Sequence, residues 1–563
     1  MLLLSWVMLI WHVRAQSRVL AVYSSSGGVY GPFGPWAAPE ILLGTTGVRV
    51  PFYPRTSGFF GSLFYSGYAG GSYLPSHSTT AKPNGTDSVT SSWSPIDNTR
   101  GEARVYYDII TLGRDDDSVA VNISMIVIDK IVYYGKYQGV QGSHGSMNWI
   151  GFGYRPRGYW EDDLSHVDDG YEFIHELKAN QSIGSKSFGF HLGIAGFARY
   201  NAASLTLGGY ERNRVLGQPA VFDWPASRVF VVDILVGVQL GDSPFPLITG
   251  PTSIFRVQGH GEEDEQATRA GGKAGSVLVS ISAEVPHIGL PYRTCNSLAQ
   301  HLPVTWDSSL NLYVWNTAEP AFERITQSAA YLAIVLSDRM AREVTIKIPF
   351  KALALVFDPP SPGQKRRTYL PCDPKQPGGY YLGRAFLQAA FWGIDYEQKA
   401  MYIAQAPGPS LGQSVLLPFP TDGGAFDAND DATFEQTWAG HWTPFNKSAT
   451  TGLRGLSKES IVFIAVGCAC AILLAIALRI AIHRRRRKNT GRGGDIIGEP
   501  NPENSPLMAV AASYSDLEVM LEMDPQVRSH EISHPLAHEL SADPAPCELP
   551  TRSWTPISRR RSI

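Results

Sequence analysis

The longest uninterrupted apolar stretch of the 563-residue chain runs from Ile461 to Ile482, and its only charge is Arg479 near the end. A helix of this length, rising ~1.5 Å per residue, extends ~30 Å, the thickness of the hydrocarbon core of a bilayer. The basic run 484–488 follows directly and marks the cytoplasmic side of a span. A buried helix of a soluble domain is the alternative, but such helices are usually shorter. We therefore predict one transmembrane helix at residues 461–482.

A shorter apolar run, Leu2–Ile10, has the length of a signal-peptide core. We predict a signal peptide over residues 1–15, cleaved after Ala15. The chain is then a single-pass membrane protein whose N-terminal part is extracellular or lumenal. The plasma membrane is the expected location, with an internal membrane as the alternative. All four glycosylation sequons precede the span, as this topology requires, and they lie at Asn84, Asn122, Asn180 and Asn446.

Between these two apolar segments, short runs of β-branched and aromatic residues alternate with turns rich in glycine and proline, which predicts an all-β protein. A Gly-punctuated turn is expected at residues 148–153 and a short helix at 171–179. The predicted strands fall at 103–112, 118–133, 187–192, 203–207, 228–234 and 276–281, with further strand pattern in 383–402.

A folded part of about 400 residues is too large for one typical hydrophobic core, so two lobes are expected, at about 16–224 and 225–408. Residues 409–460 are interpreted as a stalk. Residues 483–563, rich in Pro, Ser, Glu and His, are interpreted as a disordered cytoplasmic tail. The net charge of −3 gives no indication of nucleic acid as a partner.

Only two of the five cysteines lie in the predicted ectodomain. Cys468 and Cys470 fall in the predicted span and Cys547 in the tail, which leaves Cys295 and Cys372. Two cysteines in an oxidising compartment are expected to pair, so we predict a Cys295–Cys372 disulfide.

Five short motifs occur in an order that resembles the pepsin-like aspartic peptidases, in particular the fungal members. They are SLTLGGY at 204–210, VPHIGLP at 285–291, the stretch 298–316, YYLGRAFLQAAF at 380–391 and AQAPGP at 404–409. The resemblance covers roughly residues 100 to 409. It implies a bilobal fold of two double-psi β lobes with a ligand cleft between them, and it places Cys295 and Cys372 where the family has a disulfide of its second lobe.

The family's chemistry needs one aspartate from each lobe, so that one carboxylate activates water while the other is protonated. Each aspartate lies in an Asp-Thr/Ser-Gly turn, and this chain contains neither tripeptide. The second-lobe motif places Ser282 at the catalytic position, with Ala283 and Glu284 after it. In the first lobe, the aspartate position falls tentatively on Arg55. The resemblance therefore implies an aspartic peptidase fold without its catalytic pair.

Other acidic positions offer no replacement for the dyad. Glu284 alone supplies one carboxylate, and four aspartates that precede a serine lack the glycine of the turn: Asp87, Asp117, Asp242 and Asp307. His530-Glu531-Ile532-Ser533-His534 matches a zinc-peptidase pattern, but Pro535 disfavours a helix there. We expect no metal and no other cofactor.

Two classes of function remain. The first is a non-catalytic pseudopeptidase that binds, senses or scaffolds at the cell surface, with a peptide or cell-wall ligand as its partner. The second is an active membrane-anchored aspartic endopeptidase, which would require the two registers to be different. A cytoplasmic partner could dock on residues 508–523, although plain disorder is favoured there, and the arginine runs 484–487 and 559–561 suit anionic lipid.

Overall fold

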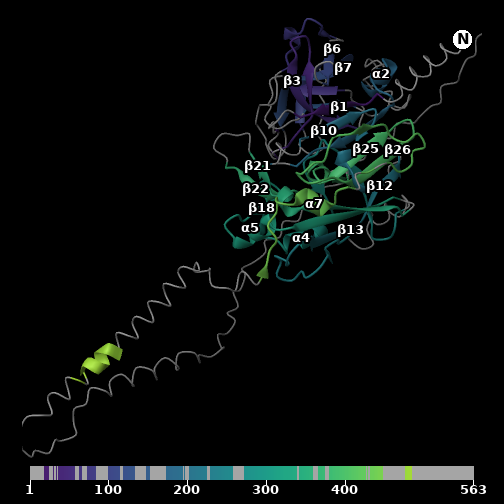
Figure 1. Ribbon diagram of the computed structural model, residues 1–563. Coiled ribbons are helices and arrows are strands. Elements are labelled where there is room, and N and C mark those ends of the chain that lie inside the picture. The colour runs from purple at the N-terminus through teal and green to yellow at the C-terminus, as the bar shows by residue number, and fades with distance from the viewer. Residues whose placement is uncertain are drawn as a thin grey trace, which may run out of the picture. The chain divides into compact units, whose positions relative to one another are not determined.

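The computed structural model divides the chain into two compact units, Met1–Gly455 and Leu456–Ile563 (Figure 1). Within 18–447 and 476–484, it describes all residues except 25–29, 31–32, 35, 57–61, 66–72, 84–98, 114–117, 134–147, 152–172, 195, 197–201, 225–228, 258–271, 339–340, 359–364, 375–378, 427, 429–430 and 483. The predicted signal peptide 1–15 and the sequon at Asn84 lie outside these residues.

The predicted membrane span is described only at its end, where residues 476–482 are helical and exposed. Among the residues that the structure describes, no helix has both the length and the apolar character needed to cross a membrane. The structure describes only residue 484 of the predicted tail.

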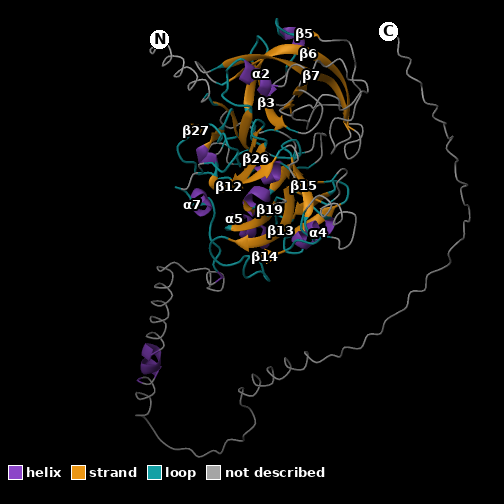
Figure 2. Ribbon diagram, turned by 90° about the vertical axis from the view of Figure 1, so that its right-hand side faces the viewer, coloured by secondary structure: helices purple, strands orange, loops and turns teal. Residues whose placement is uncertain are grey.

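Unit 1 is built mainly of β-sheets, which confirms the predicted all-β class. The unit contains a seven-stranded, a six-stranded and an eight-stranded sheet. Figures 1 and 2 show the first at one end of the unit, the second in the middle and the third at the other end. The seven-stranded sheet has the order β2 (Glu40–Leu43), β3 (Val48–Arg55), β8 (Asn148–Gly151), β4 (Ser62–Tyr65), β7 (Val119–Tyr133), β6 (Thr99–Leu112) and β5 (Lys82–Pro83). β2 also pairs with β6, so this sheet curves back on itself.

The middle sheet joins segments from both halves of the sequence, and all its pairings are antiparallel. Its order is β1 (Leu20–Tyr23), β10 (Ser204–Leu207), β9 (Ser187–His191), β25 (Ala390–Asp395), β26 (Ala400–Gln405) and β12 (Leu216–Asp223). A buried row of apolar side chains makes it part of one continuous hydrophobic core with the other sheets.

The eight-stranded sheet is formed by the second half of the unit. Its order is β20 (Glu343–Pro349), β19 (Ala330–Ser337), β13 (Val229–Val238), β15 (Val277–Ile281), β24 (Tyr380–Leu382), β16 (Ile288–Gly289) and β23 (Cys372–Asp373), with β14 (Thr252–Ser253) on β13. A four-stranded sheet lies beside it, with the order β17 (Val304–Asp307), β18 (Leu312–Trp315), β22 (Arg367–Leu370) and β21 (Leu355–Phe357).

Short helices fill the connections between strands. The α-helices are α2 (Phe173–Ala179), α4 (Tyr292–Ala299), α5 (Pro320–Gln327), α6 (Arg384–Leu387) and α7 (Phe434–Trp438), and the 3₁₀ turns are η1 (Pro75–His77), η3 (Arg212–Arg214) and η4 (Phe350–Leu353). The predicted disulfide is confirmed, because Cys295 on α4 is bonded to Cys372 on β23. The bond ties the helix to the edge of the eight-stranded sheet.

One strand arrangement occurs twice, once in each large sheet. β3 runs parallel to β8, β8 antiparallel to β4, and β4 parallel to β7. In the same way, β15 runs parallel to β24, β24 antiparallel to β16, and β16 parallel to β23. Residues 148–151, expected as part of a turn, are therefore a central strand, because they pair on both sides.

The segment predicted to be a stalk, 409–460, is folded up to Lys447, which corrects the predicted boundary at 408. β27 (Leu416–Leu417) pairs with β11 (Tyr210–Glu211). Phe419 and Phe426 are buried against Tyr210, and Trp438 of α7 is also buried. Aromatic side chains in a Gly- and Pro-rich segment bury area when a neighbouring sheet offers an apolar surface, so composition alone misled the prediction.

Candidate functional site

Arg55 and Ser282 lie at the ends of β3 and β15, the first strands of the two repeated arrangements. Arg55 is the last residue of β3 and pairs with Gly151 of β8. In the other sheet, Ile281 pairs with Leu382, and the N–H of Ser282 donates to the carbonyl of Leu382, next to Gly383. A glycine thus lies at the same end of both central strands, with Gly151 as the last residue of β8 and Gly383 directly after β24.

An ion pair joins these two strand ends. The Arg55 Nε lies 2.9 Å from the Glu284 Oε1, and the side chains are only 11% and 9% exposed. Arg55 belongs to the seven-stranded sheet, while Glu284 lies in the turn that follows β15 of the eight-stranded sheet. The pair therefore connects the two repeats through a buried charge contact.

The turn that carries Glu284 is fixed by Ser282. The Ser282 Oγ accepts a hydrogen bond of 3.2 Å from the backbone N–H of Glu284. A serine hydroxyl that accepts from the amide two residues on is a recurring way to stabilise a tight turn. Ala283 between them is buried. The Ser282 side chain thus holds the backbone of the turn, and the Glu284 carboxylate contacts Arg55.

A second guanidinium supports the same turn from α6. Arg384 is 3% exposed, and its Nη1 donates to the carbonyls of Ala283 and Glu284 at 2.9 and 2.8 Å. Its guanidinium carbon lies 5.3 Å from the ring centre of Trp36 and 4.8 Å from that of Tyr53, both in the first half of the chain. These cation–π contacts compensate a buried charge, so Arg384 also joins the two repeats.

The electrostatics of the site differ from those of a carboxylate dyad. Burial raises the pKa of Glu284, and the positive charges of Arg55 and Arg384 offset part of that rise. Both charged groups that act on the pKa of Glu284 are thus cations. A dyad needs a second carboxylate close by to share one proton. The described residues of the arrangement are two arginines and one glutamate, which suit a structural ion pair.

The other acidic candidates lie elsewhere or outside the described residues. Asp307 is the last residue of β17, where hydrogen bonds from Ser309 and Leu310 lower the pKa of its carboxyl group. Asp242 accepts a hydrogen bond from the N–H of Lys447. Asp87, Asp117 and the 530–534 histidine motif are not described. Across the described parts of the chain, no three His, Cys, Asp or Glu side chains gather in a way that suits a metal ion.

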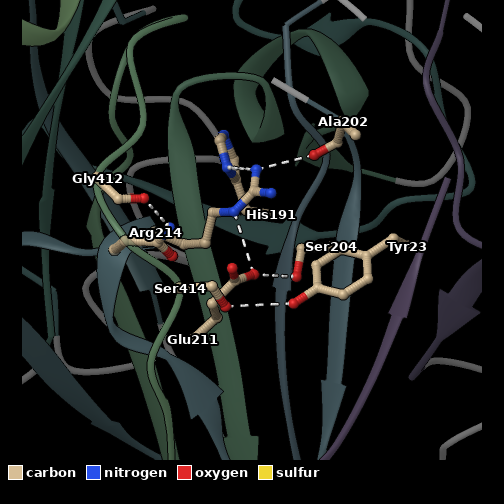
Figure 3. A network of polar contacts seen from close by, with 9 residues as sticks. Tyr23, His191, Ala202, Ser204, Glu211, Arg214, Gly412 and Ser414 are labelled. Carbon is tan, nitrogen blue, oxygen red and sulfur yellow. Dashed lines mark hydrogen bonds and ion pairs between the residues drawn. The ribbon is translucent and has the colours of Figure 1, made fainter. Parts of the chain in front are cut away.

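A second buried charge network lies against the middle sheet, and the sequence analysis did not predict it. Figure 3 shows Arg214 between Glu211 and His191, with its Nε 3.2 Å from the Glu211 Oε2. The Arg214 Nη1 also donates to the carbonyl of Ala202 at 2.8 Å. The Ser204 Oγ donates to the same Glu211 oxygen at 2.5 Å. Alternating polar positions in the SLTLGGYERNR segment were the available signal.

His191 is neutral in this network. Burial and the nearby charge of Arg214 lower its pKa to about 3. Because arginine can only donate, the Nδ1 of His191 accepts from the Arg214 Nη1 at 3.4 Å, and the Nε2–H donates to the carbonyl of Gln388 at 3.2 Å. The histidine is only 1% exposed, so it joins β9 to the α6–β25 connection and is closed to a substrate.

The same network holds the C-terminal segment on the sheet. The Asn213 Nδ2 donates to the carbonyl of Gly412 at 2.8 Å, and the hydroxyls of Tyr23 and Ser414 lie 3.4 Å apart (Figure 3). The N–H of Arg212 donates to the carbonyl of Val415 at 2.9 Å. These contacts make residues 412–417 part of the folded unit.

The three described sequons are accessible. Asn122 is exposed on β7, Asn180 follows α2 in an exposed turn, and Asn446 is exposed near the end of the folded segment. A search of protein-family models finds no match to this chain, and a search of curated proteins finds none either.

Proposed function

We propose that the chain is a pseudopeptidase: a single-pass membrane glycoprotein whose pepsin-like, bilobal double-psi unit binds a ligand and does not hydrolyse peptides. The observation that carries the proposal is the Arg55–Glu284 ion pair, which joins the two repeat-equivalent strand ends. In the family that the chain resembles, these strand ends carry the two catalytic aspartates. An arginine and a serine at those positions cannot share a proton as two carboxylates do.

The duplicated parallel–antiparallel–parallel strand arrangement supports the proposed fold, because a double-psi lobe has strands paired in this way. Glu284 cannot replace the dyad by itself. Arg55 contacts its carboxylate, and Arg384 donates to its backbone carbonyl and acts on the carboxylate through its charge. The partner class that remains is a peptide or cell-wall ligand bound without turnover.

The test is hydrolysis of a mixed peptide library by the purified full-length chain between pH 3 and 7, with and without a statine inhibitor. We expect no inhibitor-sensitive cleavage from the wild type, and none from Glu284→Gln. Saturable binding of peptide or inhibitor without cleavage would support a recognition role. Cleavage that the inhibitor abolishes would overturn the proposal in favour of an active aspartic endopeptidase.

A rebuilt dyad gives the matched control. The double substitution Arg55→Asp with Ser282→Asp places a carboxylate at both strand ends. Weak, statine-sensitive cleavage by this variant would show that the two positions are correctly assigned. If the folded variant neither cleaves nor binds the inhibitor, the assignment of the two positions is wrong.

A further inference from the structure

One loop of the described chain exposes an unusual amount of apolar surface. The 240–250 loop, which follows β13, carries Leu247 at 86% exposure and Leu240 at 41%. Pro246 beside Leu247 is also exposed. Single exposed leucines are ordinary on protein surfaces, but two in one loop, with one almost fully solvated, require a reason.

The loop is held rigidly, so its leucines point outward in a fixed direction. Phe245 and Ile248 are each 1% exposed, and the Phe245 ring packs 5.7 Å from that of Phe350. The N–H of Phe245 also donates to the Ser243 Oγ at 3.3 Å. Leu247 thus lies between the buried residues Phe245 and Ile248. Their side chains fill the core beneath the loop, and the Leu247 side chain remains exposed.

The same loop is attached to the end of the folded segment. Gly241 forms a bridge with Phe445, and the N–H of Asp242 donates to the carbonyl of Phe445 at 2.7 Å. The N–H of Lys447 donates to the Asp242 Oδ2 at 2.8 Å. A Cβ at position 241, where φ is +86°, would lie 2.8 Å from that same carbonyl, so glycine permits this close approach.

The attachment limits how much chain separates the loop from the predicted membrane span. Only residues 448–460 separate Lys447 from Ile461, and thirteen residues reach at most about 45 Å even when fully extended. A short tether raises the effective concentration of an exposed apolar surface at the bilayer, which favours contact by two leucines.

We propose that Leu240 and Leu247 insert into the interfacial region of the phospholipid bilayer that holds the 461–482 helix. This inference rests on the membrane anchoring in the proposed function. The exposed cation Arg324, whose guanidinium lies 6.0 Å from the Phe445 ring centre, is placed beside the same chain end and suits lipid headgroups.

The test uses the full-length chain with Cys468, Cys470 and Cys547 replaced by alanine, which keeps the Cys295–Cys372 disulfide. A single cysteine, Leu247→Cys, is labelled with an environment-sensitive fluorophore, and the protein is reconstituted into phosphatidylcholine vesicles. The matched control is Leu74→Cys, since Leu74 is 37% exposed and precedes η1 in the other half of the unit.

We expect the probe at position 247 to shift its emission to shorter wavelength and to be quenched at least twofold by lipid spin-labelled near the glycerol. The probe at position 74 should do neither. Protein that resists carbonate extraction, yet gives no quenching at 247, would overturn the lipid contact and leave the anchoring intact. A blue shift without lipid quenching would assign the leucines to a protein surface instead, and carbonate release would overturn both proposals.

Discussion

At the scale of single residues, Glu284 combines burial, an ion pair and a turn. A carboxylate taken out of water loses hydration, and one guanidinium contact rarely restores all of it. The raised pKa of Glu284 records that imbalance, although Arg55 and Arg384 both reduce it. The two arginines therefore make a buried carboxylate tolerable, while Ser282 and Arg384 hold the backbone around it.

The raised pKa has a consequence for stability. The folded chain binds the Glu284 proton more tightly than the unfolded chain does, whose value is about 4.5. The stabilisation by the protonated group is therefore complete below that pH and is lost as the pH rises through the folded pKa. We expect wild type to lose free energy of unfolding relative to Glu284→Gln as the pH rises from 4 to 8.

Urea unfolding of both proteins across this range measures the difference. Glu343→Gln is the control substitution, because Glu343 is 44% exposed in a surface pair with Lys273. A wild type that gains stability over Glu284→Gln with rising pH would mean that the ion pair lowers the pKa instead.

Gly383, directly after β24, allows the backbone there to pass close to the backbone of residues 285–287. A Cβ there would lie 2.3 Å from the carbonyl oxygens of both Val285 and His287, and both are backbone atoms. We expect Gly383→Ala to lower the free energy of unfolding by ~2–4 kcal/mol, because neither carbonyl can move without breaking its hydrogen bond to the 383–384 backbone.

Gly250→Ala provides the comparison in the same unfolding assay. A Cβ at Gly250 would meet no atom within 4 Å, so this variant should stay within ~0.5 kcal/mol of wild type. Equal effects of the two substitutions would show that the close approach at 383 is not present in solution.

At the scale of elements, the segment after β26 packs against the middle sheet and is not an extended stalk. The Phe426 ring lies 4.1 Å from that of Tyr210 and 5.0 Å from that of Tyr402, measured between ring centres. Four buried aromatic rings, those of Phe426, Tyr210, Tyr402 and Phe419, thus close one side of the middle sheet. Beside the buried Arg214–Glu211 pair, Asn213 and the backbone of Arg212 hold the same segment by hydrogen bonds to Gly412 and Val415.

Phe426→Ala should therefore lower the free energy of unfolding by ~3–5 kcal/mol, since it empties a packed aromatic site. Val415→Ala in the same segment is the control, because Val415 is 39% exposed and should cost much less. Denaturant unfolding of the full-length chain reports both values. A stalk, in contrast, would tolerate the two substitutions equally.

At the scale of the whole molecule, the described sequons permit a direct test of topology. Asn122, Asn180 and Asn446 are all exposed, so an oligosaccharyltransferase can reach each of them. If residues before 461 enter the secretory pathway, each single substitution to glutamine should remove one glycan. Gel mobility before and after glycosidase treatment measures this, and a chain without any glycan would contradict the proposed orientation.

Much of the β-structure followed from local patterning. The predicted strands 118–133 and 276–281 match β7 and β15 closely, since runs of β-branched residues have few other stable conformations. The Cys295–Cys372 bond was predictable as well, because elimination left only two cysteines outside the span and the tail. Residues 148–151 were missed as a strand because glycine signals a turn locally, and only pairing on both sides reveals β8.

The sequence by itself determined the absence of Asp-Thr/Ser-Gly, and with it the case against a carboxylate dyad, because a missing side chain cannot be restored by folding. It also singled out Ser282, Arg55 and Glu284 one by one. Only the tertiary structure decided that Arg55 and Glu284 form an ion pair across two sheets, and that Arg384 supports it. Their positions are 229 residues apart (284 − 55), and no local pattern encodes a contact made by the packing of two separate sheets.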